Sequence, residues 1–333
     1  MEVRLPCFAV LLAGILLLAS CQEKAPAEQV TVTFSLRKGN GTRAGSSGEA
    51  EIRRWVLLLF RDGQFTDYGL STSAEPITRT LQTGSYVAYA VANYPEASFR
   101  PETFRETKDL TEGTVDLLDN AFDAPVMFGK TDLAVSTGDA PAITVERIVC
   151  KAGIRKVSVD FTDPTLAGQP FVLKGIFLTN CCRYGRYGAD TPRESLARSE
   201  SGWYNPMGHG RFENALLGAL GLETVLTPQT PCTQPHYFLY YPNPLDPATD
   251  THATEWSPRC TRMVIEAQIG NRTCFYPITL PPIPRNHACI VEEVIIRRAG
   301  STDPEEEIPE AAEIVFSAEI HPWEQQYHDT DAY

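Results

Sequence analysis

Cysteine and histidine are the residue types that most often bind metals or take part in catalysis, and this chain of 333 residues contains both. A structural or catalytic zinc site needs thiolates and imidazoles at short, regular spacing, such as two cysteines separated by two residues. No two cysteines have that spacing, and the six histidines are scattered and stand beside no cysteine at ligand spacing. The sequence therefore predicts no metal site and no bound cofactor.

Motifs for catalysis are also missing from the sequence. It contains no nucleophile elbow, no phosphate-binding glycine loop, no paired-histidine zinc motif and no dinucleotide fingerprint. Carboxylates are plentiful, but no pair stands out as the acid and base of a hydrolase. The loop "NPMGHGRF" (205–212), which holds His209, has the most site-like composition. We expect that the protein is not an enzyme.

One cysteine does have a chemical role that its neighbours indicate. An apolar run near the N-terminus ends in Leu18-Ala19-Ser20-Cys21, which resembles a bacterial lipoprotein cleavage box. This resemblance implies a signal peptide over residues 1–20, cleavage before Cys21 and acylation of its thiol. Two or more acyl chains suffice for stable anchoring, so we expect an outer-membrane lipoprotein. An ordinary signal peptide that happens to contain Cys21 is the alternative.

The remaining cysteines and the net charge narrow the choice of function. Removing Cys7 in the signal and Cys21 leaves seven cysteines, an odd number, so at least one cannot pair within the chain. The formal net charge is −13, and lysine and arginine do not cluster. A protein without a basic face is a poor ligand for nucleic acid, so we exclude that partner.

The elements that must position any site read as short strands separated by turns. Apolar and polar residues alternate over 30–36, a nearly continuous apolar run covers 54–60, and Gly270-Asn271 predicts a hairpin turn. Residues 211–226 could form a short helix. Strands with regular turns predict an all-β protein of two antiparallel β-sandwich domains, over residues 21–150 and 151–300. Residues 301–333 then form an acidic linker and a last strand.

Two strands at the ends of the chain have the same period and length. The first presents Val30, Val32, Phe34 and Leu36 on one face. The last, after the acidic stretch "STDPEEEIPE", presents Ile314, Phe316, Ala318 and Ile320. Strands with matching patterns can occupy the same kind of groove. The last strand either pairs with a neighbouring molecule or folds back as an edge strand of its own domain.

Several stretches in this order resemble the fimbrillin family, the lipoprotein pilins that build outer-membrane fimbriae. They are the box at Cys21, "VTVTFSL", a Gly/Ser loop with Arg43, "WVLLLFRDGQF", "LQTGSYVAYAVANYP", "FGKTDLAVS", "ITVERIVCKAGIRKVSVDF", "IPRNHACIVEEVIIRRAG" and the tail "IHPW". The resemblance spans nearly the whole chain. It implies transthyretin-like domains with Greek-key connections and a cell-surface role in adhesion.

The resemblance also implies assembly by strand exchange with other fimbrial subunits. A trypsin-like protease would cut after Arg43 and free the strand from Val30 to Leu36, and a neighbour's last strand would take its place. Arg37, Lys38, Arg53 and Arg54 are weaker candidate cuts because they lie at the edges of predicted strands. A cleavable first strand and a donor tail together favour a stalk subunit over an anchor or a tip.

Two alternatives remain open from the sequence. Arg43 could be an ordinary exposed loop residue. The chain could also be a surface glycan-binding lipoprotein of a carbohydrate-uptake system, with Trp203, Trp256 and Trp323 as stacking platforms for sugars.

Overall fold

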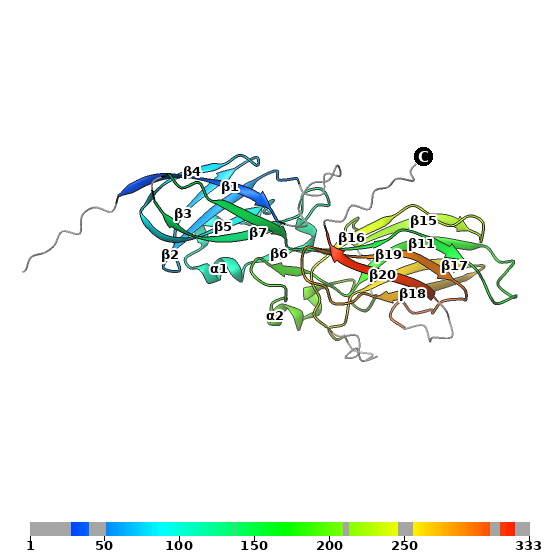
Figure 1. Cartoon of the computed structure of the whole chain (residues 1–333). Helices are drawn as coiled ribbons and strands as arrows, with labels where there is room; N and C mark the ends of the chain where they lie inside the picture. Colours follow the sequence, from blue (N-terminus) through cyan, green and yellow to red (C-terminus); the bar gives the residue numbers. More distant parts are fainter. Residues whose placement is uncertain are drawn as a thin grey trace, which may run out of the picture.

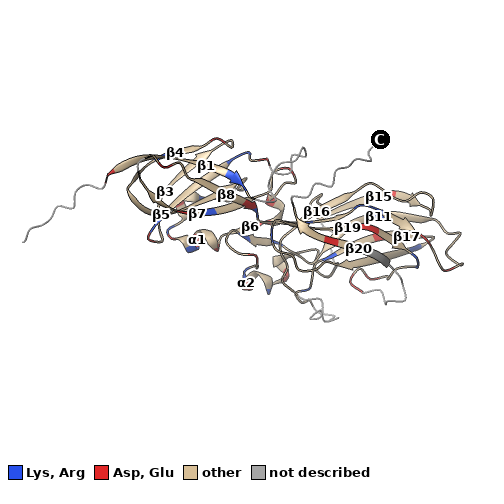
Figure 2. Ribbon diagram, viewed as in Figure 1, with Lys and Arg blue, Asp and Glu red and all other residues tan. Residues whose placement is uncertain are grey.

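The protein consists of two β lobes arranged end to end (Figure 1). The computed structural model describes residues 28–39, 51–136, 138–208, 213–245, 256–306 and 314–323, without the side chains of 314–317. Basic and acidic residues are interspersed along both lobes (Figure 2). The prediction of an all-β fold of sandwich domains is confirmed.

The N-terminal lobe is a seven-stranded sheet in the order β3-β2-β5-β7-β8-β1-β4. Its elements are β1 (Gln29–Lys38), β2 (Trp55–Arg61), β3 (Gln64–Ser71), β4 (Ile77–Gln82), β5 (Gly84–Ala92), α1 (Thr107–Thr111), β6 (Thr114–Asp116), β7 (Met127–Val135) and β8 (Ala142–Arg147). The sheet closes around a core that includes Val32, Phe34, Trp55 and Leu57. The nearly continuous apolar run over 54–60 corresponds to β2, which is buried on both faces.

The C-terminal lobe has two main sheets. Strand β20 pairs with β19 at the edge of a sheet ordered β10-β19-β9-β16, and the second sheet has the order β15-β11-β17-β18. The elements are β9 (Cys150–Ile154), β10 (Val157–Val159), β11 (Phe171–Thr179), β12 (Cys181–Cys182), β13 (Tyr184–Arg186), α2 (Glu194–Ala197), β14 (Trp203–Tyr204), β15 (Gly218–Leu226), β16 (His236–Tyr240), β17 (Arg262–Ile269), β18 (Arg272–Thr279), β19 (His287–Ile296) and β20 (Ile314–Pro322).

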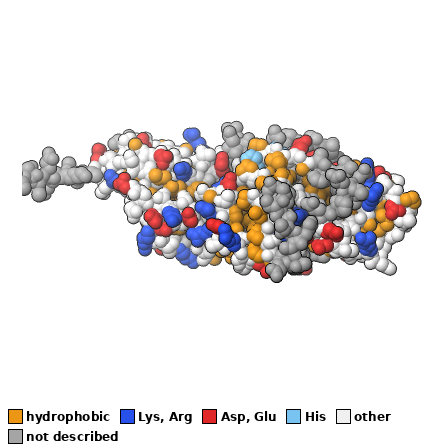
Figure 3. Space-filling view, turned by 90° about the horizontal axis from the view of Figure 1, so that it is seen from below, with side chains coloured by type: hydrophobic (Ala, Val, Ile, Leu, Met, Phe, Trp, Pro, Cys, Tyr) orange, Lys and Arg blue, Asp and Glu red, His pale blue; other side chains and the backbone are white. Residues whose placement is uncertain are grey.

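The two lobes are joined by more than the chain itself. Strand β6 of the first lobe pairs with β13 of the second, and one hydrophobic cluster extends from Val56 and Leu58 of β2 into the C-terminal sheets. Arg183 forms an ion pair with Asp116 at 2.8 Å, and the Tyr204 hydroxyl donates to the same carboxylate at 2.6 Å. In Figure 3 hydrophobic side chains gather near the middle of the molecule.

Two details differ from the expectation of antiparallel sandwiches with a helix over 211–226. Three of the described strand pairings are parallel: β1 with β8, β10 with β19, and β19 with β9. Residues 218–226 form strand β15, paired with β11, so the helix prediction is wrong there. Leu226 is buried while the adjacent Val225 is 56% exposed, as in a strand, and Gly221 at φ +70° fits a break in a strand better than a helix interior.

Candidate functional site at the first and last strands

The first strand lies inside the N-terminal sheet, between two other strands. Residues 29–34 of β1 pair with β4 in antiparallel fashion, and residues 35–38 pair with β8 in parallel. Thr33 and Thr78 also share a hydrogen bond between hydroxyls at 3.0 Å. Among the described pairings β1 is the sole partner of β4, so loss of β1 would leave one continuous groove between β4 and β8.

The side chains predicted for this groove are buried as expected. Val30 is 7% exposed, Val32 and Phe34 are fully buried, and Leu36 is half-buried against the same core. They contact a lining that includes Ile77, Leu81, Ile143 and Val145. Burial of four such side chains contributes on the order of 5–10 kcal/mol. The first strand is therefore a large part of the core of this lobe.

The basic residues near the first strand differ in their surroundings. Arg37 and Lys38 lie within β1. Arg53 makes ion pairs with Glu51 and Asp123, and the hydrogen bond that its side chain donates to the Glu51 carboxylate is the main reason that its pKa is raised. Arg54 pairs with Glu96. Arg43 and Cys21 lie outside the described residues.

The last strand occupies an edge of the C-terminal sheet. It runs antiparallel to β19 from Ile314 opposite Ile296 to Pro322 opposite His287. Ala318 is exposed and Ile320 is 50% exposed. This part of the predicted apolar face therefore points to solvent, where it buries little surface in the isolated chain. The side chains of Ile314 and Phe316 lie outside the described residues.

The end of the last strand is held much more firmly than its middle. The Trp323 indole is 7% exposed and lies 4.4 Å from the guanidinium carbon of Arg147 and 5.6 Å from the Lys151 ammonium. The Trp323 backbone N–H donates to the carbonyl of Asn286 at 3.1 Å. Cation–π contacts are strongest when desolvated, so Trp323 fixes the end of the strand at the junction of the lobes.

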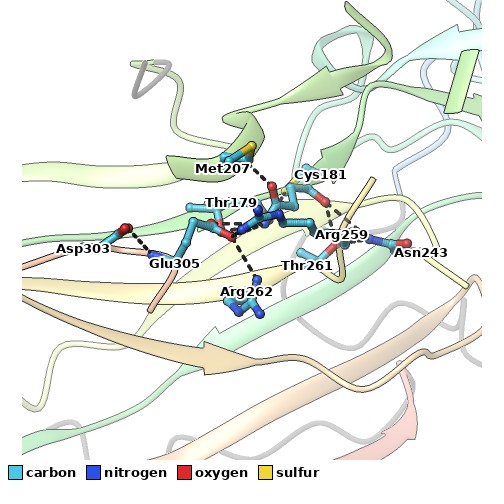
Figure 4. Close-up of polar contacts among 10 residues, drawn as sticks. Thr179, Cys181, Met207, Asn243, Arg259, Thr261, Arg262, Asp303 and Glu305 are labelled. Carbon is cyan, nitrogen blue, oxygen red and sulfur yellow. Dashed lines mark hydrogen bonds and ion pairs between the residues drawn. The ribbon is translucent and has the colours of Figure 1, made fainter. Parts of the chain in front are cut away.

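The root of the tail is held by a buried ionic cluster, shown in Figure 4. The Glu305 residue is 5% exposed. Its carboxylate accepts hydrogen bonds from Arg262 at 2.9 Å and from Arg259 at 3.5 Å. The Asn180 amide donates to both carboxylate oxygens, at 3.1 Å and 3.0 Å. The Asn180 side-chain oxygen in turn accepts from the backbone N–H of Met207 at 2.7 Å. Residues as far as 305 therefore belong firmly to the C-terminal lobe.

Two of the three tryptophans considered as sugar platforms, Trp203 and Trp323, are buried. Trp203 is 6% exposed, and its indole N–H donates to the carbonyl of Ala197 at 2.9 Å. Trp256 is half-buried against the main hydrophobic cluster, and Trp323 lies under Arg147. The alternative of sugar platforms therefore loses Trp203 and Trp323, whose rings are buried, whereas Trp256 keeps part of its surface exposed.

The described cysteines form no disulfides, and most of them are buried. All seven within the described residues are free thiols, and six of them are buried. Burial raises the pKa of the Cys150 and Cys181 thiols and raises that of Cys182 to about 12, so these thiols stay protonated and unreactive. Cys181 and Cys182 are both buried, although they are adjacent on strand β12. The described residues contain no cluster suited to a metal, and no described helix could span a membrane.

These features define a class of protein: two all-β sandwich lobes, with the first strand buried in one lobe and the last strand on an edge of the other. No protein-family model matches the chain, and no curated protein matches its sequence. Solved structures do match over nearly its whole length.

Three solved structures illustrate the likeness. A candidate cell adhesion protein from Bacteroides eggerthii has a TM-score of 0.64 at 20% identity, covering 90% of this chain and 97% of that chain. The fimbrilin FimA from Porphyromonas gingivalis gives 0.59 at 14%, covering 88% and 97%. The tip fimbrial protein Mfa3 from the same organism gives 0.54 at 14%, covering 89% and 100%. The chain therefore has the fimbrilin fold.

Proposed function

We propose that this chain is a structural subunit of an outer-membrane fimbrium that supports cell adhesion, anchored at first by lipid on Cys21. It polymerises by donor-strand exchange after a trypsin-like protease cuts at Arg43 and frees β1. The position of β1 between β4 and β8 is the observation that carries this proposal, because its removal leaves a groove for one strand of the same pattern.

The last strand, β20, supports the proposal as the strand that would be donated. Its exposed Ala318 and Ile320 belong to the face that would enter a neighbour's groove, where four apolar side chains would be buried. Because side chains alternate between the two faces of an extended strand, the residues with even numbers from 314 to 320 lie on one face. A chain with both a removable first strand and a donor strand fits a stalk subunit better than an anchor or a tip.

The alternative of a glycan-binding lipoprotein has less support. It relied on exposed tryptophans, and Trp203, Trp256 and Trp323 are occupied in packing. No other described feature favours it over assembly.

Limited trypsin treatment of the mature chain tests the proposal. We expect a cut after Arg43, loss of the fragment that carries Val30 to Leu36, and formation of SDS-resistant ladders. The variant Arg43→Gln keeps the loop but removes the cut, so it should stay monomeric. Deletion of 314–323 should leave the cut intact and abolish the ladders. Ladders that persist after that deletion would refute the donor role of β20.

A single substitution separates donation from folding. Ile320→Asn changes a half-exposed residue, so unfolding of the monomer should shift by no more than about 0.5 kcal/mol. The same change would bury an amide in a neighbour's groove and should weaken the ladders strongly. Glu319→Gln, on the neighbouring exposed residue, is the matched control and should leave the ladders as they are.

A further inference from the structure

A groove of about 780 Å³ lies where the two lobes meet. One wall is formed by Tyr89 of β5, by Phe128 to Lys130 of β7, and by Thr144 and Glu146 of β8. The other is formed by 188–190 and by Pro284, Arg285 and His287 of the C-terminal lobe. Its surface is mixed, with two stacked rings and charges of both signs, and neither β1 nor β20 fills it.

The path of β1 ends at this groove. Strand β1 begins at the end of the molecule farthest from the C-terminal lobe and runs toward that lobe (Figure 1). Its continuation, Gly39, donates its N–H to the carbonyl of Val145 at 3.0 Å. A side-chain carbon at Gly39 would come within 2.8 Å of Glu146 Cγ and 3.2 Å of Thr144 Cγ2, so a larger residue at this position would have to push the Glu146 side chain aside. Both of these residues line the groove.

A donor strand that replaces β1 would therefore deliver its last residues there. The inward residues of β1 have even numbers, from Val30 to Leu36, and those of the donor face also have even numbers, from Ile314 to Ile320. Because strand side chains alternate, any register that keeps the apolar faces together places Trp323 on the outer face, like Gly39. Alignment of Ile314 with Val30 puts Trp323 at position 39, and alignment of Phe316 with Phe34 puts it at 41.

The direction of the donor follows from how subunits can meet. A neighbour that stacks on the free end of the N-terminal lobe would send its tail in at the start of β1, and this tail would then run in the direction of β1. Its "HPW" ending then arrives at the junction of the lobes. We propose that the groove is the seat for Trp323 of a neighbouring copy of this chain, an inference that rests on the proposed strand exchange.

The groove has the chemistry to recognise an indole. The half-buried ring of Phe128 stacks on the buried ring of Tyr89 at 5.7 Å and 30° and offers an aromatic wall. Lys130 supplies a cation for the face of the ring, and the exposed Glu146 carboxylate is an acceptor for the indole N–H. Arg285 is held in place by its ion pair with Asp190 and its bond to the carbonyl of Tyr187 at 2.7 Å.

This seat differs from the place that Trp323 occupies in its own subunit. There the ring lies over Arg147, which is buried and follows Glu146 on the opposite face of β8. Exchange would thus move each Trp323 from a site within its own subunit to a separate site on its neighbour.

A single junction between two subunits tests the inference. The acceptor is trypsin-cut chain that lacks 314–323, so it cannot donate. The donor is the Arg43→Gln chain, which keeps β1 and cannot accept, with p-benzoylphenylalanine at position 323. We expect cross-links from position 323 to the acceptor's groove, at Thr144, Glu146 or Ala189, and cross-links near Arg147 in the donor alone.

The outcomes are distinct. A heterodimer whose cross-links lie elsewhere on the acceptor, near Arg147 or Lys151 for instance, overturns the groove proposal and leaves strand exchange intact. Absence of any heterodimer, also with Trp323 unchanged, overturns strand exchange and the groove proposal with it.

A variant that fills the groove gives an independent measurement. Ala189→Trp in the acceptor should speed dissociation of the heterodimer in dilute SDS about tenfold or more, because the incoming ring loses its seat. The same change in the donor should have no effect. Thr224→Trp, at an exposed position of β15, is the matched control. Equal dissociation rates for the two acceptors would contradict the inference.

Discussion

The guanidinium carbon of Arg147 lies 4.4 Å from the centre of the Trp323 ring, although the two residues come from the last strand of one lobe and the end of the chain. Arg147 also donates to the Asn286 side chain at 3.1 Å, and the Trp323 backbone donates to the Asn286 carbonyl. Three residues from three segments thus fix the end of the tail, whereas Ala318 and Ile320 just before it are exposed.

Replacement of Trp323 should loosen the tail without unfolding the lobe. Trp323→Ala removes the burial and the cation–π contact, together about 3 kcal/mol. Hydrogen exchange of the β20 amides should accelerate about a hundredfold, while exchange in β17 stays unchanged. Trp323→Phe keeps a ring over Arg147 and should show a smaller effect. Unchanged exchange in β20 would mean that strand pairing alone holds the tail.

Phe34→Ala should affect the precursor far more than the processed protein. The ring is fully buried, so its loss should lower the free energy of unfolding of the uncut chain by about 3–5 kcal/mol. The proposed processing removes this strand, so polymers made from mutant and wild-type chains should have equal stability. Thr31→Ala, at an exposed position of the same strand, is the control. A defect that persists in the polymer would show that β1 is retained.

Glu305→Gln should destabilise the C-terminal lobe. The change removes the buried negative charge that pairs with Arg259 and Arg262, at a cost of about 3–5 kcal/mol in the free energy of unfolding by urea. Glu306→Gln, on the exposed neighbour, should change it by less than about 0.5 kcal/mol. Similar values for the two variants would show that the cluster adds nothing to stability.

His236 should make the lobe sensitive to acid. Burial lowers the pKa of this imidazole below its ordinary value of 6.5. The unfolded chain therefore takes up a proton that the folded chain resists, and stability is lost as the pH falls below about 6.5. His236→Gln should lose less stability than the wild type between pH 7.5 and 5.5, measured by urea midpoints. An identical loss in the variant would rule out His236 as a source.

The local sequence pattern was enough to predict the first strand, but it did not predict how other segments pack and pair. Alternation over 30–36 predicted both β1 and its buried face, because period two is a local property of extended chain. The same rule found the last strand but could not orient it, since exposure of Ile320 depends on which side of β19 is covered. The helix expected over 211–226 failed because pairing with β11 overrides local preference.

The contacts that hold the tail had no signal in the sequence. Glu305 is separated by 43 residues from Arg262, and Trp323 lies even farther along the chain from Arg147. No spacing rule links such distant residues, and the arginines and the glutamate are of types that mostly lie on the surface. Trp203 was misassigned for the same reason, as its burial depends on how α2 packs beside it.

The direct passage from β8 to β9 has a mechanical consequence. Strand β8 ends at Arg147 and β9 begins at Cys150, so a pull on a strand in the β1 position passes through its parallel pairing with β8 straight into β9 and on to β19. Strands pulled along their length share the load among all their hydrogen bonds at once. The pairing of β6 with β13 also connects the two lobes. We therefore expect the lobes to resist bending at their junction when tension acts along the long axis.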